Sequence, residues 1–484
     1  MIFNSFHFLF FFPVVVIGYF SIPYKVRYLW LLAASYYFYM CWNAKYALLM
    51  TTSILITYLS GLLITGTRSS RLRKLWVALS FLSNLAILFF FKYYNFFGGA
   101  VNQWLESMGM HFALPSLDLL LPVGISFYTF QALSYTVDVY RGQVEVEKNP
   151  LRYALFVSFF PQLVAGPIER SQNLLTQLRL SNRFDYDRAK HGFVLMLGGF
   201  FKKVVIADRL AIFVNEVYNN CARYGAAALW LATLFFAFQI YCDFSGYSDI
   251  AIGCAKVMGY NLMKNFDRPY GARSIAEFWR KWHISLSTWF KDYLYIPLGG
   301  SRVSFSRWSF NTMVVFLTSG LWHGANWTYI LWGGIHGIYQ IIGRATRALR
   351  DATYEKLGIA KDGPFRNAVS TGVSFGLVCF AWVFFRANSL ADALYILRTM
   401  VTFGGSTFQL TKGMGYWQDV VLGGALIPLL LMAEHFLHRH GGNAWLQRCV
   451  LPVRWLVYMV GILSVVLFGI YGSLSEASFI YFQF

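Results

Sequence analysis

The sequence predicts an all-α, polytopic integral membrane protein, and two observations carry this prediction. Hydrophobic residues make up 57% of the 484 residues and charged residues only 13%, whereas a soluble domain carries about 25% charged residues. Apolar runs of about 18 residues or more recur along the whole chain, and each is long enough to cross a hydrocarbon core. We therefore expect roughly ten to thirteen membrane-embedded helices, because only helices or closed barrels satisfy the backbone in lipid.

The first apolar run is interpreted as a retained helix, because no basic segment precedes it and no small-residue cleavage site follows it. Two shorter apolar pieces, 153–167 and 309–322, are candidates for re-entrant or tilted segments. The longer runs are centred in 4–22, 28–43, 47–66, 75–97, 118–139, 193–213, 226–257, 325–342, 367–386, 418–437 and 455–473.

The net charge of +19 is dispersed between the apolar runs. This distribution fits the positive-inside rule and gives no reason to expect nucleic acid as a partner. The loops 344–366 and 438–454 are basic and are expected in the cytoplasm, whereas 98–117 and 387–417 carry little charge and are expected outside. The amino terminus then lies outside. No repeat or long soluble linker appears, so we expect one membrane domain over 1–484, with lipids as its surroundings.

The longest polar interruption, 258–309, contains an amphipathic pattern. Ser274 and Glu277 form a capping box that predicts a helix start, and apolar residues recur at helical spacing from Ile275 to Phe290. We expect one interfacial helix, ended by the turn at Pro297, with His283 at the border of its apolar face. The opposite arc carries the basic residues Arg280, Lys281 and Lys291.

Two histidines stand in apolar sequence, and ionisable groups at membrane depth are functional candidates by default. His323 lies in LWHGAN, beside Trp322 and Asn326, at a break between two apolar segments. His336 lies between glycines, where Gly333 and Gly337 permit close helix contact. His336 is therefore either a packing residue or part of a site.

A second polar cluster, QIYCDFSGYSDIAIG, occupies 239–253. Ser245 and Asp249 share one helix face, and Asp243 lies on another, so the two carboxylates do not form a dyad on one helix. Proton relay, polarity of an acceptor site and structural hydrogen bonding all remain open for these three residues.

Other cations interrupt apolar runs, and we expect most of them to extend to the membrane interface. They are Lys92, Lys202, Lys203 and Arg386. The chain contains no HExxH motif and no CxxC pair, so the sequence predicts no metal site. It also lacks a GxSxG elbow and a Walker A loop, which argues against nucleotide hydrolysis. The six cysteines are expected to pack in the core.

The chain resembles the membrane-bound O-acyltransferase (MBOAT) family, and within it the bacterial membrane subunits of alginate O-acetylation. The matching blocks cover most of 120–390; in one of them Cys242 stands where an aromatic residue is expected. The blocks are LLPVGISFYTFQALSYTVDVYRG (120–142), FFPQLVAGPIER (159–170), FFKKVVIADRL (200–210), YCDFSGYSDIAIG (241–253), NFDRPYGARSIAEFWRKWHISLSTWFKDYLYIPLGG (265–300), GLWHGANWTYILWGGIHG (320–337) and FAWVFFRANSL (380–390).

This resemblance implies an all-helical fold pierced by a funnel. His323 corresponds to the family's membrane histidine and His283 to its second polar position, so both are the expected catalytic residues. Asn326, His336, Trp322, Asp243, Ser245 and Asp249 are then candidates for supporting the site or lining the channel.

A buried imidazole stays neutral and can accept the proton that a hydroxyl loses when it attacks a thioester. His323 can do this or carry the acyl group transiently, while His283 or Asn326 can polarise the carbonyl or orient His323. The segment from Lys264 to Arg307 holds eight Lys or Arg against three Asp or Glu. It should attract a phosphate-bearing donor, with Arg280, Lys281 and Lys291 as candidate contacts.

The resemblance makes acetyl-CoA the expected donor, with no permanently bound cofactor. It implies a multi-pass protein in the inner membrane of a bacterium that passes acetyl groups outward for O-acetylation of a polysaccharide such as alginate. An extracytoplasmic SGNH-type transferase and the polysaccharide are the expected partners. The alternatives are D-alanyl transfer to teichoic acid from a carrier protein, and a polysaccharide transporter or flippase, although neither internal repeats nor broken helices in corresponding halves are visible.

Overall fold

The computed structural model describes residues 1–110, 112–118, 120–180, 182–360, 362–404 and 417–471. Within these residues it contains helices and loops and no β-strand, which confirms the predicted fold class. The chain forms two compact units. Unit 1 comprises Met1–Met196 and Ile250–Met263, and unit 2 comprises Leu197–Asp249 and Lys264–Phe484. The expectation of one domain over 1–484 remains a prediction.

Unit 1 is built from the amino-terminal helices. Side chains at the helix starts explain several boundaries: Asn43 caps α3 by accepting from the Lys45 backbone N–H, and Asn149 caps α7 in the same way. Its elements are α1 (Phe6–Ser21), η1 (Tyr24–Val26), α2 (Arg27–Met40), α3 (Ala44–Gly66), α4 (Ser70–Leu88), η2 (Phe89–Tyr93), α5 (Tyr94–Ser107), α6 (Ile125–Tyr140), α7 (Pro150–Ser158), α8 (Phe160–Leu163), η3 (Ser171–Leu175) and the first part of α9 (Tyr186–Phe200).

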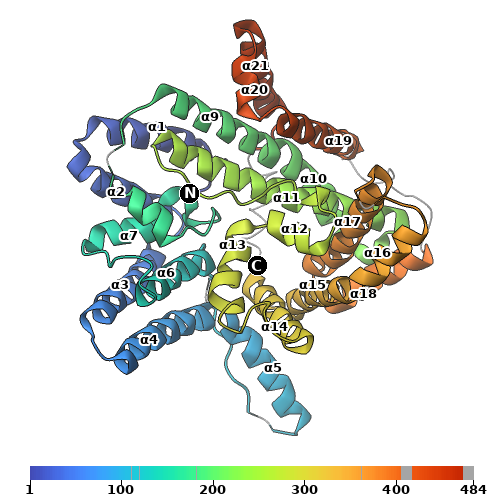
Figure 1. Cartoon of the computed structure of the whole chain (residues 1–484), viewed down its shortest axis with the longest axis horizontal. Coiled ribbons are helices and arrows are strands. Elements are labelled where there is room, and N and C mark those ends of the chain that lie inside the picture. Colours follow the sequence, from blue (N-terminus) through green and yellow to red (C-terminus); the bar gives the residue numbers. More distant parts are fainter. Residues whose placement is uncertain (111, 119, 181, 361, 405–416, 472–484) are drawn as a thin grey trace. The chain divides into compact units, whose positions relative to one another are not determined.

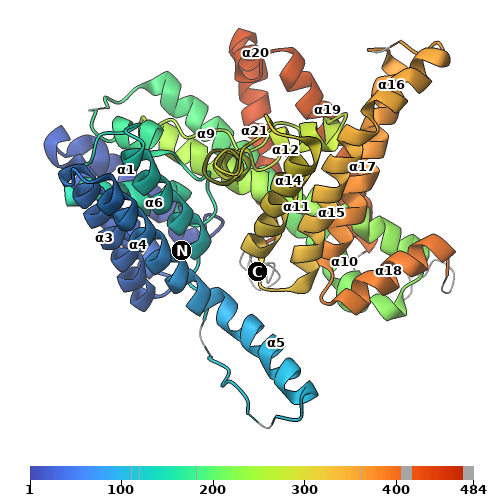
Figure 2. The same cartoon turned by 60° about the horizontal axis from the view of Figure 1, so that its bottom comes forward.

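The core of unit 1 lies where α3, α4 and α6 run side by side (Figures 1 and 2). Gly61 of α3 allows the Tyr135 ring of α6 to come close, since a Cβ at Gly61 would lie 2.9 Å from that ring. A buried carboxylate, Glu169, holds two loops together because it accepts hydrogen bonds from the Met263 backbone and, at 2.8 Å, from Asn173. Burial raises the pKa of Glu169 to about 7.

Unit 2 holds the remaining helices, and α11 contributes residues to both units. Four five- to seven-residue π-helical stretches occur among the described residues, and two of them, η4 and η7, lie in unit 2. Of these, η4 lies between α9 and α10. The elements are η4 (Phe201–Ala207), α10 (Asp208–Asn219), η5 (Cys221–Arg223), α11 (Ala226–Val257), η6 (Pro269–Gly271), α12 (Ile275–Lys281), α13 (Ile284–Phe290), η7 (Lys291–Tyr295), α14 (Phe305–His323), α15 (Trp327–Ala345), α16 (Arg347–Lys356), α17 (Pro364–Arg386), α18 (Leu390–Thr402), α19 (Trp417–Arg439), α20 (Asn443–Arg448) and α21 (Leu451–Phe468).

The helical hairpin of α14 and α15 is the tightest pair in unit 2, and α17 packs against it (Figure 2). Glycines make this possible, as the spacing of Gly333 and Gly337 predicted. A Cβ at Gly333 would lie 2.2 Å from the Phe316 carbonyl oxygen, and one at Gly320 would lie 2.3 Å from the Tyr329 carbonyl oxygen. The two backbones therefore meet directly, which no larger residue allows.

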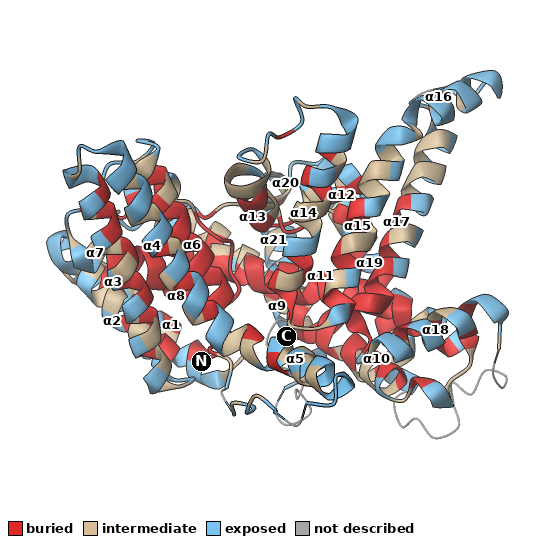
Figure 3. Cartoon of the chain, turned by 90° about the horizontal axis from the view of Figure 1, so that it is seen from below, coloured by how far each residue is buried: buried red, intermediate tan, exposed pale blue. Residues whose placement is uncertain are grey.

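Most of each apolar run predicted as a membrane segment falls on a helix. The run 118–139 begins as a loop, because α6 starts only at Ile125, and α21 ends at Phe468, before the end of the last run. Residue 119 and residues 472–473 lie outside the described residues. Burial is concentrated in the packed middle of each unit, whereas α16 is almost entirely exposed (Figure 3). Six helical stretches are long and apolar enough to span a membrane on length and composition alone. They are Ala44–Gly66, Ser70–Ser107, Ala226–Val257, Pro364–Arg386, Trp417–Arg439 and Leu451–Phe468.

Candidate active site

His323 is the last residue of α14, at the break that the sequence predicted. The chain turns at Gly324, and α15 begins after Asn326, whose side chain accepts a hydrogen bond from the Thr328 backbone N–H at 3.0 Å. Asn326 is thus the cap of α15, and this contact engages the oxygen of its amide. The His323 ring is buried and meets the Trp332 ring edge-on at a centroid distance of 5.0 Å.

The predicted single amphipathic helix over 275–290 is wrong, because His283 interrupts it. The capping box is confirmed at its start, where Ser274 accepts from the Glu277 backbone N–H at 3.1 Å. Helix α12 ends at Lys281 and α13 begins at Ile284. Between them His283 adopts a left-handed backbone with φ of 44°, which costs about 1–2 kcal/mol for a residue with a Cβ. The break turns the His283 ring into the protein, so it is fully buried and does not border an interfacial face.

A tryptophan brings the two histidines into one cluster. The Trp322 ring lies 5.0 Å from His323 and 6.0 Å from His283, both measured between ring centroids. The Phe244 ring of α11 meets His283 edge-on at 4.6 Å, and the Phe385 ring of α17 lies 5.4 Å from His323. Segments that are distant in sequence therefore build one aromatic site around two imidazoles.

The His283 imidazole is neutral at physiological pH, because burial lowers its pKa to about 3. No charged side chain contributes to this shift, and desolvation alone favours the uncharged ring. A neutral imidazole keeps a lone pair on one nitrogen, so the site contains a base that does not need to be deprotonated first.

His336 lies in the same aromatic cluster but makes a different set of contacts. Its Nδ1 accepts a hydrogen bond from the Trp279 indole N–H at 3.2 Å, which places the ring proton on Nε2. The Trp332 ring contacts both His336 and His323, at 5.1 and 5.0 Å. The Trp332 ring therefore lies between His336 and His323 and packs against both histidines.

The carboxylates of α11 are held by lysines of η4. Asp243 pairs with Lys203 at 2.7 Å, and Asp249 pairs with Lys202 at 2.9 Å. Lys203 also pairs with Asp208 at 2.8 Å. The expectation that these lysines extend to the interface is wrong: Lys203 is only 5% exposed, because the π-helical turn directs both lysines toward α11, where the acids offset the cost of burying the charge.

Ser245 is buried on the same helix, and its hydroxyl has no hydrogen-bond partner among the described residues. Arg386 likewise does not extend outward. It is buried at the end of α17 and donates to the side-chain oxygens of Asn215 at 2.8 Å and Asn219 at 3.2 Å. Lys92 in unit 1 donates to the Ser126 hydroxyl at 3.4 Å.

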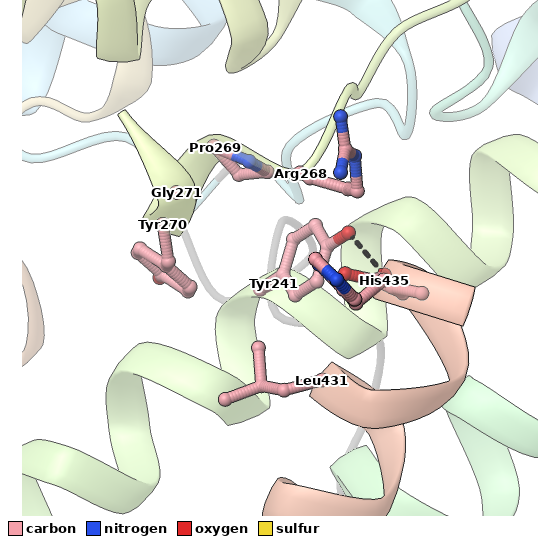
Figure 4. A pocket seen from close by; sticks show the side chains of 8 residues that line it. Tyr241, Arg268, Pro269, Tyr270, Gly271, Leu431 and His435 are labelled. Carbon is pink, nitrogen blue, oxygen red and sulfur yellow. Dashed lines mark hydrogen bonds between the residues drawn. The ribbon is translucent and has the colours of Figure 1, made fainter. Parts of the chain in front are cut away.

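A cavity of about 140 Å³ lies beside this ion-pair network in unit 2 (Figure 4). The Tyr241 hydroxyl donates to Glu434 at 2.5 Å on one wall, and the left-handed Arg268 stands on another. Tyr241 and Tyr270 also contact Trp282, the residue before His283, at 6.3 and 6.0 Å. The lining is Tyr241, Arg268, Pro269, Tyr270, Gly271, Leu431, Glu434 and His435.

The three basic residues predicted to contact a donor are not equivalent. Arg280 and Lys291 are exposed, whereas Lys281 is half-buried and pairs with Glu277 at 2.7 Å. Arg280 and Lys291 therefore remain accessible to an anionic ligand, and Lys281 is engaged within its own helix.

Sequence reasoning missed Asn265 and the lysine partners of α11. Asn265 is 1% exposed and contacts His283 at 3.1 Å, although 18 residues separate them in sequence. Its position in the polar stretch NFDRPY gave no signal of this contact. The lysines were visible, and the acidic residues in the apolar run 226–257 could have indicated that they would pair.

The structure thus defines a polytopic membrane protein with two buried histidines in an aromatic site and, among its described residues, no group of side chains suited to a metal ion. Residues 145–382 match the model of the membrane-bound O-acyltransferase family, MBOAT.

The similar proteins agree with this match. The chain is 41% identical to the probable alginate O-acetylase AlgI of Pseudomonas aeruginosa, over 85% of this chain and 76% of that protein. It is 38% identical to the peptidoglycan O-acetyltransferase of Helicobacter pylori, over 84% of this chain and 80% of that protein. Identity to the teichoic acid D-alanyltransferase of Streptococcus thermophilus is 27%, over 59% of this chain and 74% of that protein.

The chain belongs to the MBOAT family and is a membrane-embedded O-acyltransferase. The predicted family and enzyme class are therefore confirmed. Because the chain belongs to a family of enzymes, the alternative that it is a polysaccharide transporter is set aside.

Proposed function

We propose that this chain is an O-acetyltransferase of a bacterial inner membrane. It takes acetyl groups from acetyl-CoA in the cytoplasm and passes them across the membrane for O-acetylation of a polysaccharide such as alginate. The names of the more similar relatives support acetyl transfer, because both the alginate and the peptidoglycan relatives are at least 38% identical over most of the chain.

The observation that carries the proposal is the pair of buried histidines joined by Trp322. His323 comes from the end of α14 and His283 from the break between α12 and α13, and both rings contact the Trp322 ring. A packing role alone explains neither the break in the helical hairpin nor the strained backbone at His283, since strain of this kind concentrates at functional sites.

The proposed chemistry is transfer of an acetyl group from a thioester to a hydroxyl. The hydroxyl oxygen bonds to the carbonyl carbon, the C–S bond breaks, and the hydroxyl proton passes to the ring of His323. The thiolate leaves as coenzyme A and takes up a proton. The aromatic walls from Trp322, Trp332 and Phe385 exclude water, which would otherwise hydrolyse the thioester.

The proposed donor fits the charges near the site. Arg280 and Lys291 are exposed on the segment that follows the cavity-lining turn, where Lys291 also pairs with Asp292 at 3.6 Å. Exposed cations there attract the phosphates of acetyl-CoA. In this proposal an extracytoplasmic SGNH-type transferase receives the acetyl group and completes its delivery to the polysaccharide.

The test uses purified full-length protein with radiolabelled acetyl-CoA and the partner transferase. We expect His323→Ala to lower acetyl transfer by about 10³-fold, because the transition state loses its base. His438→Ala is the matched control, since His438 is an exposed histidine of α19 in the same unit, and it should keep full activity. Retention of activity by His323→Ala would contradict the proposal.

D-alanyl transfer to teichoic acid remains the second candidate, because the teichoic acid relatives are similar over more than half of the chain. The donor distinguishes the two functions. Label from acetyl-CoA should reach glycan in the first case, whereas the second requires a D-alanyl thioester on a carrier protein and gives no transfer from acetyl-CoA.

A further inference from the structure

Asn265 is a fully enclosed amide beside the His283 ring. It precedes the η6 turn in unit 2, and its Oδ1 lies 3.1 Å from His283 Nδ1. Two other groups reach the same oxygen: the Ser285 backbone N–H at 3.2 Å and the Ser285 hydroxyl at 2.9 Å. On its other side, the Asn265 amide nitrogen donates to the Ser248 hydroxyl of α11 at 3.2 Å.

These contacts fix which end of the Asn265 amide faces His283. A backbone N–H can only donate, so the atom that it meets must be the carbonyl oxygen and not the nitrogen. The Ser248 hydroxyl satisfies the nitrogen at the opposite end. A flipped amide would place its NH₂ against the Ser285 N–H, so that two donors would face each other and that hydrogen bond would be lost.

The orientation of the amide then fixes the tautomer of the imidazole. Because Asn265 Oδ1 has no hydrogen to give, the hydrogen bond at 3.1 Å requires a proton on His283 Nδ1. A neutral ring carries one such proton, so Nε2 holds the lone pair and can only accept.

The backbone holds this arrangement in place. The Ile284 N–H donates to the Asn265 carbonyl at 2.9 Å, and the Asp267 N–H donates to the Lys281 carbonyl at 2.9 Å. The segment from 265 to 267 is thus bonded on both sides of the break that His283 makes. This bracing explains how His283 persists at a φ of 44°.

We propose that Asn265 is a positioning residue that holds His283 in the Nδ1–H tautomer, so that His283 acts in acyl transfer as a hydrogen-bond acceptor through Nε2. This inference rests on the proposed function and decides between two roles for His283. A ring whose unprotonated nitrogen only accepts does not donate to the thioester carbonyl, so polarisation of that carbonyl falls to other groups.

The surroundings of the ring fit an acceptor that stays neutral. The Phe244 ring of α11, the Phe266 ring and the Trp322 ring of α14 pack against His283, and none of them is charged. Asp243, next to Phe244, is paired with Lys203, and His323 lies on the other side of Trp322. Burial keeps the pKa of His283 near 3, which preserves the lone pair at physiological pH.

Two substitutions at Asn265 test the proposal by activity, each with a matched control at Asn311. Asn311 is a buried asparagine of α14 whose amide donates to the Gly300 carbonyl at 3.3 Å. Asn265→Leu should lower kcat about 10²-fold while the KM for acetyl-CoA changes less than about threefold, because the tautomer and not the donor site is disturbed. Asn311→Leu should leave kcat within about twofold of the unsubstituted enzyme if the protein folds.

The second substitution gives a readout that loss of packing does not produce. In Asn265→Asp a carboxylate faces His283 Nδ1–H, which stabilises the imidazolium and raises its pKa by about 2 units. The acid limb of the profile of log kcat/KM against pH should move upward by the same amount, since a protonated ring cannot accept. Asn311→Asp should leave the limb in place. A gain of activity in acid would show that His283 acts as a donor and would overturn the proposal.

The tautomer itself is measured without any reaction, by nitrogen NMR of the full chain labelled with ¹⁵N-histidine. The His283 signals are identified by their loss in His283→Gln, and we expect the proton on Nδ1. A proton on Nε2 would overturn the proposal even if the substituted proteins fail to fold. If the unsubstituted enzyme transfers no acetyl group, the proposed function fails, while the NMR measurement still decides the tautomer.

Discussion

The contact between Gly333 and the backbone of α14 sets the position of His323. Helix α15 approaches α14 so closely that a Cβ at Gly333 would lie 2.2 Å from the Phe316 carbonyl oxygen, about 1.2 Å short of the 3.4 Å of an ordinary contact. The obstacle is backbone, so it cannot rotate away. The next residue, Gly334, offers a control, since a Cβ there would meet the Leu317 side chain at 3.5 Å.

Gly333→Ala should therefore push the two helices apart by about 1 Å and destabilise the protein by about 1–3 kcal/mol through overpacking. Gly334→Ala adds a methyl group at an ordinary contact distance from the Leu317 side chain and should stabilise its helix by up to about 1 kcal/mol. Because His323 ends α14, the same displacement should reduce acetyl transfer about 10²-fold in Gly333→Ala, as an error of 1 Å in a reacting group does.

Thermal unfolding of the purified protein followed by tryptophan fluorescence measures the first effect, and acetyl transfer measures the second. We expect the Tm of Gly333→Ala to fall about 1–4 °C below that of Gly334→Ala, because a chain of 484 residues has a large entropy of unfolding. Equal Tm values and equal activities for the two variants would refute the reasoning, because the chemical change is the same and only the distance to α14 differs.

Two further predictions concern buried ionisable side chains, one charged and one neutral. Lys203→Met leaves Asp208 and Asp243 buried without their cation and should lower the free energy of unfolding by about 3–5 kcal/mol. The control Lys264→Met removes an exposed ion pair and should lower it by less than about 1 kcal/mol. Denaturant unfolding measures both free energies, and similar values would contradict the buried pairing. Burial lowers the pKa of His283 from 6.5 to about 3 in the folded protein, so the unfolded chain binds a proton first as the pH falls. The contribution of the neutral ring to the free energy of unfolding should be complete above pH 6.5 and should be lower by about 2 kcal/mol at pH 5. In His283→Gln this loss between pH 6.5 and 5 should be reduced by that amount, and an unchanged profile would show that the ring is not neutral in the folded state.

The sequence by itself determined the class of protein, and it predicted the two histidines, His283 and His323, that the structure brings into contact with one tryptophan. The length and hydropathy of the apolar runs were sufficient to predict membrane helices, because a helix that crosses lipid must be predominantly apolar over about 20 residues. The break at His323 was also visible, since Gly324 and Asn326 are the residues that end one helix and begin the next. The spacing of Gly333 and Gly337 gave the close contact of α14 with α15, since small residues are what such a contact requires.

The break at His283 was not visible, because the periodicity of 275–290 continues through it. Helical periodicity reports which side chains are apolar, and both α12 and α13 bury apolar side chains on either side of the turn. The left-handed turn depends on backbone hydrogen bonds that Ile284 and Lys281 make with residues 265 and 267. No local pattern encodes bonds to a segment 14 to 19 residues away.

The tertiary structure alone decided which charges and amides meet. Lysines 202 and 203 had the composition of interface cations, yet a π-helical turn directs them to Asp249 and Asp243 of α11. Asn265 became part of the histidine site through a contact that spans 18 residues. The apolar face of a helix can be read from the spacing of its own residues. The partner of a buried polar group is instead the donor or acceptor that the fold places within about 3 Å of it, and that group can come from any part of the chain.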